Sequence, residues 1–156
     1  MIKKILIHAI FILIVSCGFQ PMLKEMDNTN IKIKKIDFIG ENEINYQIKN
    51  TLGLVEEPKS NGLLITISTK ENTTVVNKNN SGVTTEEKLT ISVNLTITDN
   101  DKNNLLTEQI SESARFQLSS NSIDDESEKN NILGNLINIV SQKIKFKLLI
   151  LSKNLK

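Results

Sequence analysis

The sequence is poorest in the residue types that many enzymes use for chemistry. It has one cysteine, one histidine and no tryptophan, and aromatic residues make up only 4% of it. His8 and Cys17 both lie close to the N-terminus, so residues 18–156 contain neither residue type. This excludes a histidine general base, a thiol nucleophile and a zinc site of the Cys/His kind from that part of the chain.

A glycine-rich phosphate loop is also lacking, because the 6 glycines are scattered. Carboxylates remain, and two of them in one cleft can do acid-base work. They occur as three adjacent pairs, each in a predicted loop or at a predicted helix start, where solvated charge is the simpler interpretation. We therefore expect no enzyme, no cofactor and no metal site. The pairs are Glu56 with Glu57, Glu86 with Glu87, and Asp124 with Asp125.

The N-terminus combines a basic start, an apolar run and a small residue before a cysteine. Lys3 and Lys4 precede the run Ile5–Val15, and Ser16 stands directly before Cys17. This order is typical of a secretory signal peptide. The run is too short for a transmembrane helix, which takes roughly 20 apolar residues.

The residues around the cleavage point indicate lipidation. Ile14-Val15-Ser16-Cys17 resembles a lipobox, in which the cysteine thiol receives a diacylglycerol and the freed amine is then acylated. The alternative is an ordinary signal peptide followed by a chance cysteine, but a secreted domain with a disulfide would need a second one. We expect residues 1–16 to be a lipoprotein signal peptide, Cys17 to be the lipidation site, and residues 17–30 to be a lipidated tether on a membrane surface.

The charge balance argues against a nucleic-acid partner. The chain has 19 basic and 18 acidic side chains, and removal of residues 1–16 takes away two lysines and no acidic residue. The mature chain is therefore close to neutral and lacks the basic balance of a nucleic-acid-binding domain. Residues 31–156 are enough for one domain with its own hydrophobic core.

Hydrophobic periodicity predicts six elements in this domain. Apolar residues alternate with polar ones in four segments, as in half-buried strands, and recur at steps of three and four in two others, as in amphipathic helices. The order β-α-β-β-β-α predicts an α+β fold with two helices packed on a mainly antiparallel four-stranded sheet. The expected strands are residues 31–39, 63–68, 89–97 and 106–118, and the expected helices are residues 43–52 and 124–153.

Four local features refine this prediction. The alternation slips at residues 34–35, which indicates a β-bulge. Asn42 is expected to cap the first helix and Gly53 to end it. Residues 77–82 are expected to form the turn after the second strand, although residues 73–76 could extend that strand.

Two groups of charged residues fit the pattern less well. Glu108 and Glu112 interrupt the fourth strand on its apolar side. The end of the last helix is basic, which suits the helix dipole, and we interpret this group as a solvated helix end or a partner contact. Its members are Lys143, Lys145, Lys147, Lys153 and Lys156.

The start of the expected mature chain resembles that of a known family. Cys17-Gly18-Phe19-Gln20-Pro21-Met22-Leu23, with the element order that follows, resembles the LptE family of lipopolysaccharide-assembly lipoproteins, where Cys-Gly-Phe and a Pro-Leu-like pair open the mature chain. Met22 departs from the usual leucine. The resemblance implies a lipid-anchored, periplasm-facing protein of the outer membrane. It also implies a plug that sits inside the large β-barrel LptD, helps that barrel assemble and assists insertion of lipopolysaccharide into the outer leaflet.

The resemblance further implies two contacts with the anionic glycolipid. In the family, basic residues before the long alternating strand and near the start of the last helix are implicated in touching lipopolysaccharide. By position these match Lys78 and, more loosely, Lys129. The other interpretation is that both are ordinary solvated lysines.

Two further functions stay open from the sequence. A non-catalytic accessory or scaffolding lipoprotein of another envelope complex would copurify with that complex. A carboxylate-based hydrolase on a lipid anchor would need two acidic groups that converge in one cleft.

Overall fold

The computed structural model describes residues 31–119 and 121–154. The expected signal peptide, Cys17 and the tether lie outside these residues. Six elements follow one another in the predicted order and confirm the α+β class. They are β1 (Ile33–Gly40), α2 (Asn42–Leu52), β2 (Leu63–Lys78), β3 (Thr84–Thr98), β4 (Asn104–Gln117) and α3 (Ser122–Asn154).

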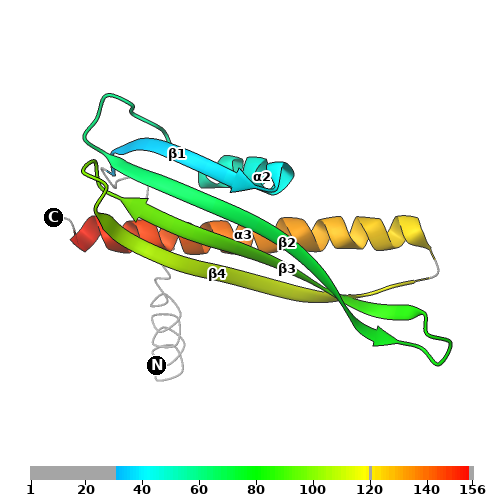
Figure 1. Ribbon diagram of the computed structural model, residues 1–156. Coiled ribbons are helices and arrows are strands. Elements are labelled where there is room, and N and C mark those ends of the chain that lie inside the picture. Colours follow the sequence, from blue (N-terminus) through cyan, green and yellow to red (C-terminus); the bar gives the residue numbers. More distant parts are fainter. Residues whose placement is uncertain (1–30, 120, 155–156) are drawn as a thin grey trace, which may run out of the picture.

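The four strands form one sheet in the order β1-β2-β3-β4. β1 pairs with β2 in parallel, and the other two pairings are antiparallel. α2 makes the crossover that a parallel pair requires, and α3 runs along the sheet behind β3 and β4 (Figure 1). Neither helix in the described part of the chain combines the length and apolarity needed to cross a bilayer.

The hydrophobic core lies between the two helices and one face of the sheet. Every second residue of β3 from Leu89 to Ile97 is fully buried, as the period of a strand requires. Burial of one such side chain contributes roughly 1.5–3 kcal/mol. On α3 the buried residues recur at steps of three and four, so that one stripe of the helix covers the sheet. They include Leu133, Leu136, Ile137, Val140, Ile144 and Leu148.

β1 contains the predicted bulge. The register with β2 shifts between Ile33 and Lys35. The extra residue changes the parity of the strand, because a shift of one residue turns a side chain to the other face. Ile33 before the bulge and Ile36 and Phe38 after it therefore all contact the same core.

The turn from β1 into α2 is packed tightly against β2. Gly40 has φ +103°, and a Cβ atom there would lie 2.1 Å from the backbone oxygen of Thr69. The Thr69 hydroxyl accepts a hydrogen bond from the Glu41 N–H (3.2 Å) and donates one to Oδ1 of Asn45 (2.8 Å). The side chains of Thr69 and Asn45 are buried. This small polar network attaches the start of α2 to the sheet.

The caps of α2 were predicted only in part. The expectation that Asn42 caps the helix was wrong, because the N-cap is Glu41, whose side chain makes no capping hydrogen bond, and Asn42 is already helical. The Glu41 N–H donates a hydrogen bond to the hydroxyl of Thr69 in β2. Gly53 ends the helix as predicted, with φ 58° in the left-handed region.

Candidate functional site

One face of the sheet is polar and has no helix over it. Both helices contribute to the core on the opposite face, so within the described residues this face stays open (Figure 1). At its centre the side chains are almost all neutral hydroxyls and amides, because alternate residues of each strand point away from the core, and charged residues such as Asp37 and Lys88 lie toward its margins. We call this surface the open sheet face. It consists of Thr66, Ser68, Lys70, Asn72, Thr90, Ser92, Asn94, Thr96, Thr107, Gln109, Ser111 and Ser113.

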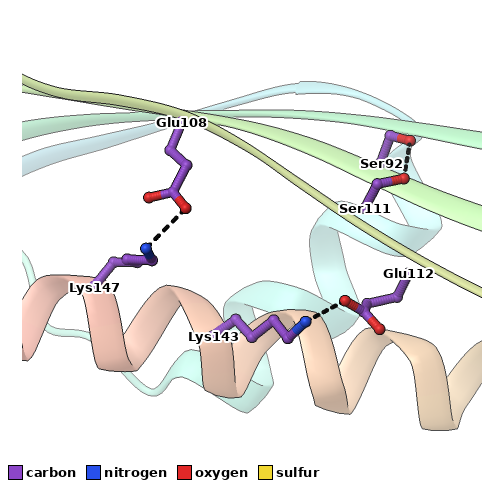
Figure 2. Close-up of polar contacts among 6 residues, drawn as sticks. All are labelled: Ser92, Glu108, Ser111, Glu112, Lys143 and Lys147. Atoms are coloured by element: carbon purple, nitrogen blue, oxygen red, sulfur yellow. Dashed lines mark hydrogen bonds and ion pairs between the residues drawn. The ribbon is translucent and has the colours of Figure 1, made fainter.

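Hydroxyl groups meet across the strands of this face. The Oγ atoms of Ser92 in β3 and Ser111 in β4 lie 2.9 Å apart in a hydrogen bond (Figure 2). Such groups both donate and accept hydrogen bonds, so they can satisfy one another, water or a partner's polar groups. Apart from Lys70, the open sheet face can therefore contact a polar surface without the cost of burying unpaired charge.

β2 and β3 extend past the end of β4 and form a long hairpin (Figure 1). The segment 73–76 extends β2, which is the alternative the sequence left open, and Asn77 and Lys78 are also in the strand instead of the predicted turn. The turn is ordered by Asn79, whose Oδ1 accepts hydrogen bonds from the N–H groups of Ser81 and Val83, each at 3.0 Å. Gly82 has φ 79°, which glycine adopts readily.

Lys78 and Lys129 have different surroundings. Lys78 is exposed at the end of the hairpin and has no ion-pair partner among the described residues. The Nζ atom of Lys129 in α3 lies 3.0 Å from Oε1 of Glu71 in β2. Glu71 is seven residues before Lys78 in β2, which corresponds to about 23 Å along the strand. The two lysines therefore do not converge on one anion site.

Two glutamates of β4 pair with lysines of α3. The Nζ atom of Lys147 lies 2.8 Å from Oε1 of Glu108, and Lys143 forms an ion pair with Glu112 (Figure 2). These pairs explain why both glutamates interrupt the apolar side of β4. Lys143 and Lys147 are therefore not part of a freely solvated helix end, contrary to one of our two interpretations of that basic group.

These ion pairs help to set the position of α3 relative to β4, but they add little to the stability of the fold. All four side chains are partly exposed, with the lysines at 51% and 34%, and such pairs typically contribute less than about 1 kcal/mol each. Between them lies a hollow of about 410 Å³, which Phe146 also lines. We call this hollow, with the adjoining edge of β4, the β4–α3 groove.

The acidic pairs have local structural contacts. Oε1 of Glu56 accepts a hydrogen bond from the Ile36 N–H at 2.6 Å. Glu86 and Glu87 are neighbours in β3 and so point to opposite faces of the sheet. Oδ1 of Asp125 accepts from the Ser119 N–H at 2.7 Å, beside the start of α3. In the described residues, no cluster of three or more potential metal ligands occurs.

The fold is similar to that of several solved bacterial lipoproteins. A rare lipoprotein B from Shewanella oneidensis superimposes with a TM-score of 0.61 at 10% identity, covering 78% of this chain and 98% of that one. A minor lipoprotein from Acinetobacter baumannii gives 0.58 at 14% identity, covering 80% and 94%. A lipoprotein B from Nitrosomonas europaea gives 0.58 at 13% identity, covering 74% and 81%. At these identities the likeness shows the fold alone.

The comparison of sequences identifies the family. No curated protein sequence matches the chain closely enough to count as a relative. The family model described as "LptE: Lipopolysaccharide-assembly" matches residues 30–148, which is well over half of the chain and almost the whole described domain. The match confirms the resemblance predicted from the sequence. The chain belongs to the LptE family of lipopolysaccharide-assembly proteins.

Proposed function

We propose that the protein is a lipid-anchored lipoprotein of the outer membrane, held through Cys17, with its domain on the periplasmic side. There it would act as the plug and assembly factor of an LptD-like β-barrel during transport of lipopolysaccharide and its insertion into the outer leaflet. The role is one of binding, without catalysis. Family membership supports the pathway, and the open sheet face is the single structural observation that supports the plug.

The open sheet face suits the interior of a large barrel. The lumen of such a barrel is polar and water-filled, so a plug must present polar surface to the wall. Here most apolar side chains of the sheet lie on the face under the helices, and Ile39 of β1 is an exposed exception on the other face. The opposite face offers hydroxyls and amides that can pair with the wall directly or through water.

Substitution at the centre of the open sheet face should weaken the complex with the barrel. We expect Ser92→Arg to reduce the amount of copurified barrel by about tenfold, equivalent to about 1.4 kcal/mol, because a long cation replaces a small hydroxyl in the contact. The unfolding midpoint should hardly change, since the face is outside the core. Affinity purification from membranes measures the effect. Asn138→Arg, on an exposed position of α3, is the matched control and should retain the barrel; equal losses for both variants would refute this face as the contact.

Lys78 is our proposed contact with the glycolipid phosphates. A lysine ammonium pairs with phosphate as a point charge, and Lys78 is exposed and unpaired in the described structure. We expect Lys78→Glu to weaken lipopolysaccharide binding by about three- to tenfold, in line with the loss of one charge-assisted contact, while the barrel complex stays intact. Binding assays on the purified complex would show this, with Lys59→Glu in an exposed loop as the control. Unchanged binding would leave Lys78 as an ordinary surface lysine.

Lys129 is the second proposed contact and should contribute less. Its ammonium group is already paired with Glu71 at 3.0 Å. To bind a phosphate, Lys129 must either stay paired with Glu71 and interact with both anions, or break the ion pair. In either case the free energy gained from the phosphate contact is smaller.

A further inference from the structure

The two edges of the sheet differ in how they are covered. Along β1, the Ile33 carbonyl accepts a hydrogen bond from the Glu57 N–H, and the Ile36 N–H donates to the side chain of Glu56. Along β4, no residue of the described chain hydrogen-bonds to the outer side of the strand. β4 spans 14 residues with no proline or glycine. It therefore presents a long row of unpaired backbone groups, which is a template for another strand.

An apolar stripe of α3 lies beside this free edge. Ile139, Phe146 and Ile150 are 42%, 40% and 41% exposed. They are separated by seven and four residues, so they share one side of the helix. Phe146 lies between Lys143 and Lys147, the two lysines that reach across to β4. Phe146 therefore lines the β4–α3 groove together with the strand edge, and Ile139 and Ile150 extend the apolar stripe along α3 on either side of it.

We propose that the β4–α3 groove binds a second copy of this chain. The two β4 strands would pair antiparallel about a two-fold axis at Ser111, and the two α3 stripes would face each other beneath them. The result is one continuous eight-stranded sheet with a closed, symmetric interface. This inference is independent of the plug proposal and concerns the protein before it joins another partner.

In this register, the side chains of one β4 strand are compatible with those of the β4 strand in the second copy. Ser111 opposes Ser111 of the second copy, and Leu106 opposes Phe116, which its own core already buries. Glu108 then opposes Ala114, and Glu112 opposes Ile110. A shift of the axis by one residue in either direction sets a glutamate opposite a glutamate, which destabilises a strand pair. Of the three registers with the axis at residue 110, 111 or 112, only the one at Ser111 therefore avoids this repulsion.

The helices match about the same axis. The ion pairs of Lys143 with Glu112 and Lys147 with Glu108 place the middle of α3 beside Ser111. Ile139 and Ile150 lie on either side of that point, so each faces the other's equivalent in the second copy. Because α3 packs under β3 and β4, and neighbouring strands are about 4.8 Å apart, the two helix axes would be about 10 Å apart. Packed helices are typically separated by about 8–10 Å.

A cysteine at the two-fold axis tests the register directly. We expect oxidation of full-length Ser111→Cys in mild detergent, produced without excess barrel, to convert most of the protein into a disulfide-linked dimer. Ser113→Cys is the matched control, since it has the same residue type on the same face. Its two sulfur positions would be about 13 Å apart along the strand, too far for a disulfide. The unsubstituted chain, with Cys17 as its only cysteine, sets the baseline.

Sedimentation adds a readout without cysteines. Phe146→Asp should lower the dimer fraction at least about tenfold. Ile123 is 76% exposed at the start of α3, outside the proposed interface, so Ile123→Asp should leave the dimer fraction unchanged. Both variants should keep the unfolding midpoint of the unsubstituted protein. Equal crosslinking at residues 111 and 113, a monomer at all concentrations, or crosslinking of Ser111→Cys to another protein would each overturn the proposal.

Discussion

Replacement of Gly40 by alanine is expected to lower the free energy of unfolding by about 4 kcal/mol or more. Two costs add at this position. The backbone has φ +103°, which a residue with a Cβ adopts only with strain of about 1–3 kcal/mol. The new Cβ would also lie 2.1 Å from the Thr69 carbonyl oxygen, and because both groups belong to the backbone, β1 or β2 must move. Urea unfolding followed by circular dichroism measures the loss.

Gly53→Ala separates these two costs. Gly53 also has a positive φ, 58°, but a Cβ there would meet nothing within 4 Å. Its substitution should therefore cost only the left-handed strain, about 1–2 kcal/mol. If Gly40→Ala proved no more destabilising than Gly53→Ala, the tight packing of the β1–α2 turn on β2 would be contradicted.

Cys17→Ser is expected to move nearly all of the protein from the membrane fraction to the soluble fraction. Serine has no thiol to receive the diacylglycerol, and each buried acyl methylene contributes about 0.8 kcal/mol to anchoring. Fractionation and immunoblotting measure the distribution. Met22→Leu, which restores the usual family residue a few positions away, should leave the protein in the membrane fraction. Retention of Cys17→Ser there would contradict the proposed anchor.

The sequence predicted the elements whose pattern depends on local burial. β3 alternates over its buried length because one face contacts the core and the other stays open. α3 has a continuous apolar stripe for the same reason. The bulge of β1 was also visible, because a break in parity is a property of the sequence itself.

Features that depend on distant contacts were harder to predict. Glu108 and Glu112 are charged residues on the inward face of β4, and the sequence gives no reason for them. The structure does, because each forms an ion pair with a lysine of α3, Lys147 and Lys143 respectively. The start of α2 is likewise attached to the sheet through the Glu41 N–H and Thr69, which lie 28 residues apart. Spacing along the chain carries no signal for such pairs, which arise only when helix and sheet pack together.

The candidate site was predicted only in outline. Lys129 was placed on the last helix and Lys78 in a turn, but nothing in the sequence showed that Lys129 is paired with Glu71 or that Lys78 extends β2. The polar residues of the open sheet face were visible as the second half of each alternation. That no helix covers them depends on both helices packing on one side, which only the structure shows.

The most direct test of the plug proposal is purification of the tagged mature lipoprotein from its own membranes, with mass spectrometry of its partners and of the Cys17 peptide. We predict a large β-barrel in near-equal amount together with an acylated Cys17. An acylated Cys17 with another envelope complex, or with no partner, would contradict the plug and favour an accessory or scaffolding lipoprotein instead.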